Sequence, residues 1–247
     1  MKINTLLLII TIGLTASSCF DAPNYPDQPH IDFNYVQFKL GNFPDADSLI
    51  VSVDFEDGDG DVGLGPEESN YPFSNKIYFN KSGQRFDPQF DVLPDELATF
   101  SDADDLGLPP YSGDFICLNY DINPTLRRID GVEVQVNDTV YYEFNQRYNN
   151  FIIQLQIKEN GEFRDYNERT ELECSTTFSG RFPILSDDLS KPSPLEGSIR
   201  YAIAEIAFND KFQSETLRLR VFIYDREGNP SNVVESPEFT LQDIRVN

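Results

Sequence analysis

The strongest constraint on the fold is an alternation of apolar and polar residues with a period of two. In the segment 217–224, Leu217, Leu219, Val221 and Ile223 occupy every second position. Successive side chains of a β-strand point to opposite faces, so this pattern predicts a strand that is buried on one face. The same period occurs in 31–40 and 48–56, and helical periodicity is nearly absent.

This period and the turn residues between segments predict an all-β chain. Asn160-Gly161, between two strand-like runs, is a strong signal for a two-residue hairpin turn. Short strands separated by such turns favour an immunoglobulin-like antiparallel β-sandwich of about seven strands. The predicted strands are 31–40, 48–56, 149–158, 162–166, 198–209, 215–225 and 233–242.

The segment 64–147 follows the second predicted strand and is too long to be a plain loop. We interpret it as a partly irregular insertion in one sandwich domain that spans 31–247, with a separate second domain as the alternative. Two strands are expected inside it, at 75–80 and 132–144. The acidic stretch between them is expected to pack over the sandwich through Phe90, Leu93, Leu97 and Phe100.

The first eighteen residues have the features of an export signal. A basic start is followed by an apolar stretch over 3–14, which is too short to span a bilayer, and by Ala-Ser-Ser directly before Cys19. This end resembles the lipobox of bacterial lipoproteins, which implies cleavage after residue 18 and acylation of Cys19, palmitate included. Residues 19–30, rich in proline, would then form the lipid anchor and tether. The alternative is an ordinary cleaved signal with Cys19 as a spare thiol.

Export also implies an oxidising environment for the remaining two cysteines. Cys117 and Cys174 form an even pair in a chain that leaves the cytoplasm, so a disulfide between them is expected. Two buried free thiols are the alternative.

An acidic loop after the second predicted strand suggests a metal site. Asp57, Asp59 and Asp61 alternate with glycines, which allow the backbone to wrap tightly enough for the carboxylates to converge on one cation. In an EF-hand alignment these residues take the first, third and fifth positions and Glu68 the twelfth. Val62 stands where that loop needs glycine, and a strand precedes it, so an EF-hand proper is not expected.

A sandwich would bring a second loop to this site. Strands alternate in direction, so the loops after the second and sixth strands lie at the same pole, which places Asp225, Asn229 and Asn232 near the acidic loop. Asp57, Asp59, Asp61, Glu68, Asp225 and Asn229 are therefore candidate ligands of a structural calcium ion, preferred to magnesium. The alternative is a solvated acidic turn.

Several stretches, taken together, resemble outer-membrane lipoproteins of the Bacteroidota. They are VDFEDGDGDVGL, PPYSGDFICLNYDI, DTVYYEFNQRYNNFIIQLQIKENGEF, FSGRFPIL, PLEGSIRYAI and VFIYDREGNPSNVVESPEFTL. The resemblance implies a lipid-anchored, often surface-exposed, sandwich-like protein of a group largely without assigned activity. Such lipoproteins accompany large outer-membrane β-barrels, as partners in nutrient uptake or as accessory subunits of assembly and secretion machines.

The net charge and the scarcity of histidine reduce the number of functions that this chain could have. With 19 Lys and Arg against 42 Asp and Glu, the chain has a net charge of −23, which excludes nucleic acid as a partner. The single histidine, His30, lies in the predicted tether, so no enzymatic activity is expected. The favoured function is an interaction module at the cell surface, most concretely an accessory subunit of an outer-membrane β-barrel complex. The alternative is glycan or nutrient binding through Tyr111, Tyr120, Tyr141, Tyr142 and Tyr148.

Overall fold

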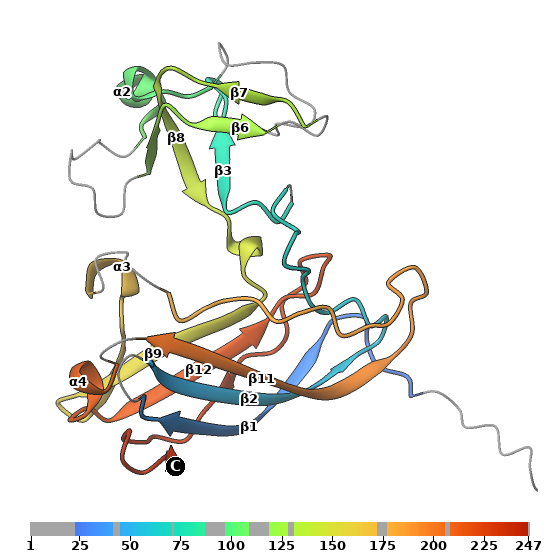
Figure 1. The fold of residues 1–247 in the computed structure, drawn as a ribbon, viewed down its shortest axis with the longest axis vertical. Coiled ribbons are helices and arrows are strands. Elements are labelled where there is room, and N and C mark those ends of the chain that lie inside the picture. The colour runs from blue at the N-terminus through green and yellow to red at the C-terminus, as the bar shows by residue number, and fades with distance from the viewer. Residues whose placement is uncertain are drawn as a thin grey trace, which may run out of the picture.

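The computed structural model confirms an all-β fold (Figure 1). It describes residues 23–41, 45–70, 72–86, 97–108, 119–127, 131–171, 177–205 and 208–246. Helices are limited to single turns in this part of the chain, and none of its helices is long and apolar enough to cross a membrane.

The first sheet has the strand order β11-β2-β1-β14. Its strands are β1 (His30–Lys39), β2 (Asp47–Asp57), β11 (Leu195–Glu205) and β14 (Arg245–Val246). The central strand β2 pairs antiparallel with both neighbours, in a register that places Val53 opposite Phe33 and Ile199. The short β14 runs parallel to β1, so the expected antiparallel pairing holds everywhere in this sheet except at its last strand.

The second sheet has the strand order β10-β9-β12-β13 and is antiparallel throughout. Its strands are β9 (Phe151–Glu159), β10 (Glu162–Asp165), β12 (Leu217–Ile223) and β13 (Val234–Glu235). Asn160 and Gly161, both with positive φ, form the predicted turn between β9 and β10.

One hydrophobic core joins the two sheets into a sandwich. Val51 and Val53 of β2 share a cluster with Leu219 and Val221 of β12, and all four are fully buried. The ring of Phe151 stacks on Tyr201 of the opposite sheet, with centroids 4.9 Å apart. Burial in β12 alternates strictly, as its sequence predicts.

The chain between β2 and β9 forms further sheets of its own. One has the order β4-β3-β8-β5, and the other pairs β6 with β7. The bounds are β3 (Lys76–Phe79), β4 (Arg85–Phe86), β5 (Tyr120–Ile122), β6 (Thr125–Arg127), β7 (Glu133–Gln135) and β8 (Thr139–Phe144). Figure 1 places β3, β6, β7, β8 and the short helix α2 (Ala103–Leu106) beyond one edge of the sandwich, connected to it by two chain segments.

The insertion has buried clusters that are separate from the sandwich core. Leu97, Val140 and Tyr142 belong to one of them. The expectation that Leu97 and Phe100 pack over the sandwich is wrong, because Leu97 is buried inside the insertion and Phe100 is 47% exposed beside Tyr120. Phe90 and Leu93 lie outside the described residues.

Short helical turns complete the described structure. They are η2 (Phe100–Asp102), α2 (Ala103–Leu106), η3 (Gln146–Tyr148), α3 (Glu168–Glu171) and α4 (Phe208–Phe212). The prediction of a strand through 209 is wrong at its end, since α4 begins at Phe208 and buries Phe208 and Phe212 on one face.

Other predicted boundaries also differ, and the expected strand 132–144 is divided into β7 and β8. The expected strand 233–242 is reduced to β13, because the Ser236 hydroxyl accepts a hydrogen bond from the backbone N–H of Leu219 and Pro237 has no N–H to donate.

The predicted tether is held by the sandwich over its last residues. The carbonyl of Pro26 accepts a hydrogen bond from the N–H of Gly58, and strand β1 starts at His30.

Candidate metal centre

The acidic loop starts where β2 ends and is held by neighbouring backbone. A Cβ on Gly58 would lie 2.4 Å from the carbonyl oxygen of Tyr25, and one on Gly60 would lie 2.5 Å from that of Ser193. Gly60 also has a φ of +71°, which favours glycine. The N–H of Ser193 donates to the Asp59 carbonyl at 3.0 Å. The alternating glycines are therefore required by close packing on the backbone.

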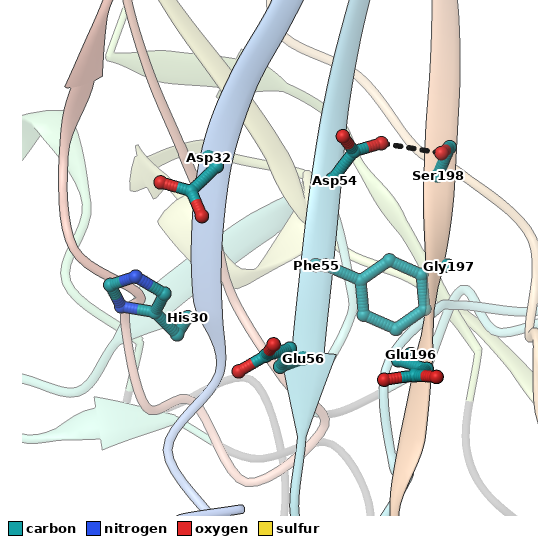
Figure 2. Close-up of a pocket in the computed structure, with 8 residues that line it drawn as sticks. All are labelled: His30, Asp32, Asp54, Phe55, Glu56, Glu196, Gly197 and Ser198. Carbon is teal, nitrogen blue, oxygen red and sulfur yellow. Dashed lines mark hydrogen bonds between the residues drawn. The ribbon is translucent and has the colours of Figure 1, made fainter.

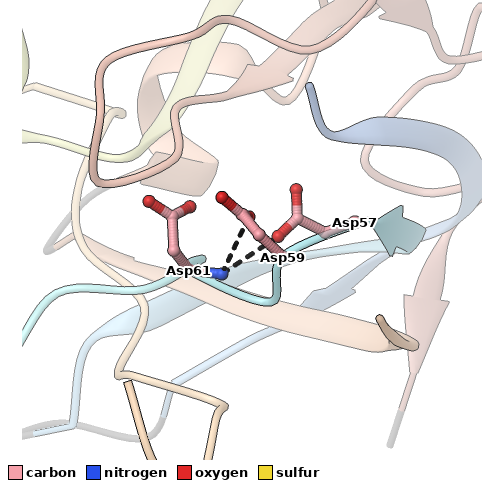
Figure 3. A group of neighbouring side chains, drawn as sticks. All are labelled: Asp57, Asp59 and Asp61. Carbon is pink, nitrogen blue, oxygen red and sulfur yellow. Dashed lines mark hydrogen bonds between the residues drawn. The ribbon is translucent and has the colours of Figure 1, made fainter. Parts of the chain in front are cut away.

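The three aspartates of this loop converge. Asp57, Asp59 and Asp61 each offer a carboxylate oxygen, and these oxygens all lie within 4.8 Å of one another. Figure 3 shows the three side chains along one side of the loop. The N–H of Asp61 donates to Asp57 Oδ2 at 3.1 Å and to Asp59 Oδ1 at 3.4 Å, which fixes the turn. This group could hold a metal ion.

Two oxygens in the group are buried without a hydrogen-bond partner, Oδ1 of Asp57 and Oδ1 of Asp61. Asp57 is 0% exposed. Burial, followed by the neighbouring Asp59 carboxylate, raises the pKa of Asp57 to about 7. Burial and the nearby Asp225 raise the pKa of Asp61 to about 6. Negative charge is therefore costly at this site in the absence of a cation.

The loop after β12 lies beside the acidic loop, as predicted. Val62 forms an antiparallel bridge with Asp225, and the N–H of Arg226 donates to the Asp61 carbonyl at 3.3 Å. The Asp225 carboxylate accepts from the N–H groups of Gly228 and Asn229 at 2.6 and 2.7 Å, and from Asn229 Nδ2 at 2.7 Å. Asp225 and Asn229 are thus engaged with each other in their own turn.

Asn232 and Glu68 point to other partners. Asn232 Oδ1 accepts a hydrogen bond from the N–H of Ile31 on β1, and Asn232 Nδ2 donates to the Ile31 carbonyl, both at 2.8 Å. Nη1 of Arg226 donates to Glu68 Oε2 at 2.8 Å, and Nη2 contacts Oε1. The structure therefore brings Asp57, Asp59 and Asp61 together and directs Glu68 to an arginine that sequence reasoning did not single out.

Arginines also hold the neck, by which we mean residues 65–75 and 145–150 that connect the insertion to the sandwich. Arg181 donates from Nη1 to the Glu68 carbonyl and from Nη2 to the Phe73 carbonyl, both at 2.8 Å, and stacks on Tyr148. The amide of Asn145 donates to the carbonyls of Pro72 and Ser74 at 2.7 Å. No sequence pattern marks these residues.

A second acidic depression lies on the outer face of β11, β2 and β1 (Figure 2). It is lined by His30, Asp32, Asp54, Phe55, Glu56, Glu196, Gly197 and Ser198. The Ser198 hydroxyl contacts Asp54, which also accepts from Asn34 Nδ2 at 3.1 Å. The hydroxyl of Tyr25 contacts Glu196. Asp54 and Glu196 thus have ordinary surface partners, and no acid that lines this depression has a buried oxygen without a hydrogen-bond partner.

The remaining predicted residues divide in two groups. Cys19, Cys117, Cys174 and Tyr111 lie outside the described residues, so lipidation and the disulfide stay predictions. Tyr120, Tyr141 and Tyr142 are 3%, 5% and 7% exposed and belong to the insertion core. These three tyrosines do not form a sugar-binding platform in this structure.

Comparison with known proteins adds no assignment. A scan against protein-family models finds no match, and searches of curated proteins and of solved structures find no significant similarity.

Proposed function

We propose that this chain is a lipid-anchored, non-catalytic interaction module of the outer membrane that binds an outer-membrane β-barrel protein through its insertion. The observation that carries the proposal is the insertion itself. It has its own sheet and its own buried clusters, and it extends from the sandwich on the arginine-held neck.

The distribution of exposed apolar side chains supports docking through the insertion. Of the seven large hydrophobic residues that are exposed in the described chain, four belong to the insertion, namely Phe100, Ile122, Val132 and Phe144, and Leu185, Leu189 and Val233 lie outside it. Exposed apolar side chains are candidates for protein contact sites, and the insertion has more of them than the rest of the described chain. The lipobox at Cys19 and the likeness to lipoproteins of the Bacteroidota support placement at the outer membrane, on its cell-surface side.

The test is mild-detergent affinity purification of the full-length lipidated protein from its native membrane, followed by mass spectrometry. We expect a stoichiometric outer-membrane barrel protein to co-purify. Ile122→Asp replaces an apolar side chain that is 52% exposed on the insertion by a charged one. Val233→Asp is the matched control, because it replaces an apolar side chain that is 48% exposed on the sandwich. Ile122→Asp should release the barrel and Val233→Asp should retain it. A purified monomer without a stoichiometric partner would contradict the proposal.

A further inference from the structure

We propose that Asp57, Asp59 and Asp61 bind one calcium ion, which fixes the loop pole of the sandwich. This inference is independent of the proposed function. It combines three structural observations: the convergence of the carboxylates, the burial of Asp57 with an unpartnered oxygen, and a backbone frame that keeps the loop closed.

The buried oxygen is the observation that points to a ligand. Asp57 Oδ2 accepts the N–H of Asp61, whereas Oδ1 has no partner although the residue is 0% exposed. A carboxylate oxygen removed from water without a hydrogen bond or counter-charge is strongly unfavourable. Oδ1 of Asp61 is also buried without a hydrogen-bond partner. A cation held by the three carboxylates would supply the missing counter-charge.

No basic side chain forms an ion pair with these aspartates in the part of the chain that is described. Arg226 is close to Asp61, but its guanidinium is engaged by both oxygens of Glu68. The Asp61 carboxylate also has Asp225 as a neighbour of the same sign. The local charge is therefore strongly negative, and a divalent cation is the natural counter-charge.

The frame around the loop means that the carboxylates cannot simply move apart. Gly58 and Gly60 pack directly on the backbone of residues 25–26 and 193. Leu64 donates to the Phe182 carbonyl at 3.0 Å, and Val62, fully buried, bridges to Asp225. Because four separate segments hold this loop, the carboxylates are preorganised for a ligand.

The ligand chemistry favours calcium over magnesium. The group offers oxygen atoms only, from an irregular loop, and calcium accepts six to eight oxygens in flexible geometry. Magnesium needs a near-ideal octahedron and loses its waters reluctantly. Glu68 is not a ligand in this assignment, since Arg226 occupies it, and Asp225 and Asn229 are engaged in their own turn. Water completes the coordination shell.

The experiment is calorimetric titration of calcium into chelator-treated, full-length protein in detergent, with magnesium as a parallel titration. We expect one calcium per chain, bound at least tenfold more tightly than magnesium, and a higher melting temperature in calcium. No heat with calcium and an unchanged melting temperature would overturn the proposal, and so would equal affinity for the two ions.

Variants locate the site. Asp59→Asn should weaken calcium binding by tenfold or more, because it removes one charged ligand. Asp32→Asn makes the same chemical change in the second acidic depression and should leave the affinity unchanged. Asp57→Asn should abolish the calcium-induced rise in melting temperature while raising the melting temperature of the chelated protein, since it removes a buried charge. Equal loss of binding in Asp32→Asn, or a lower melting temperature of chelated Asp57→Asn, would contradict the assignment.

Discussion

Arg226 pairs with both carboxylate oxygens of Glu68 although 157 residues separate them in the chain, and its backbone N–H donates to the carbonyl of Asp61. The pair therefore connects the acidic loop to the start of the neck. Nη1 of Arg226 also donates to the carbonyl of Gly63 at 3.2 Å. The side chains of Arg226 and Glu68 are 20% and 28% exposed, so the pair is partly shielded from water.

Breaking this pair should destabilise the protein. Glu68→Gln leaves the Arg226 guanidinium partly buried with a weaker partner, and we expect a loss of about 1–2 kcal/mol in the free energy of unfolding. Glu238→Gln is a matched control, because it removes an exposed pair with Lys158 and should cost less than about 0.5 kcal/mol. Urea unfolding of the chelated proteins measures both. Equal costs for the two variants would show that the pair at Glu68 contributes no more than an ordinary surface contact.

The same pair predicts a pH dependence. The hydrogen bond from Arg226 lowers the pKa of Glu68 below its usual value of 4.5. The folded protein therefore holds the carboxylate charged where the unfolded chain would take up a proton. Its contribution to stability is fully present above pH 4.5 and is lost as the pH falls through the lowered folded-state pKa. Between pH 5 and pH 3, wild-type protein should lose more stability than Glu68→Gln, and parallel loss in both would exclude this contribution.

Local periodicity was sufficient to predict the main strands, because burial on one face of a sheet requires alternation, as in Leu217, Leu219 and Val221. It was not sufficient for α4. This single turn contains one buried pair, Phe208 and Phe212, and the N–H of Asn209 is accepted by Asp47 Oδ2, far away in sequence. A helical turn stabilised by a distant residue has no local signature.

The site shows the same division. The spacing of Asp57, Asp59 and Asp61 follows from a local turn, so the sequence predicted their convergence. Glu68 pairs with Arg226 because the loops after β2 and β12 pack against each other. The EF-hand alignment compares positions within one loop only, so it could not predict this partner. The neck contacts of Arg181 are likewise long-range. Sequence reasoning found the residues of the acidic loop and the proximity of the loop after β12, and it missed the side-chain contacts that join the two loops.

Gly60 allows a direct test of the frame around the acidic loop. Gly60→Ala adds a Cβ in a backbone with φ of +71° and only 2.5 Å from the Ser193 carbonyl oxygen, whereas Gly83, with φ of +77°, has no atom within 4 Å of such a Cβ. Gly83→Ala should cost about 1–2 kcal/mol through its backbone conformation alone. Gly60→Ala should cost about 1–3 kcal/mol more, because the backbone must also shift. Both are measured by urea unfolding in chelator, so cation binding does not contribute. A similar loss in the free energy of unfolding for both variants would mean that the backbone at residue 60 can shift at little cost.

The insertion should respond to core substitutions independently of the sandwich. Leu97 is fully buried in a cluster with Val140 and Tyr142, and no residue of the sandwich core belongs to that cluster. Leu97→Ala should therefore destabilise the insertion by about 2–5 kcal/mol. Hydrogen exchange should accelerate at the amides of β3 and β8 and stay unchanged in β9 and β12. Leu219→Ala is the reciprocal control, because it leaves a cavity of the same kind in the sandwich core and should accelerate exchange in β9 and β12. Uniform acceleration in both variants would show instead that the insertion and the sandwich unfold as one cooperative unit.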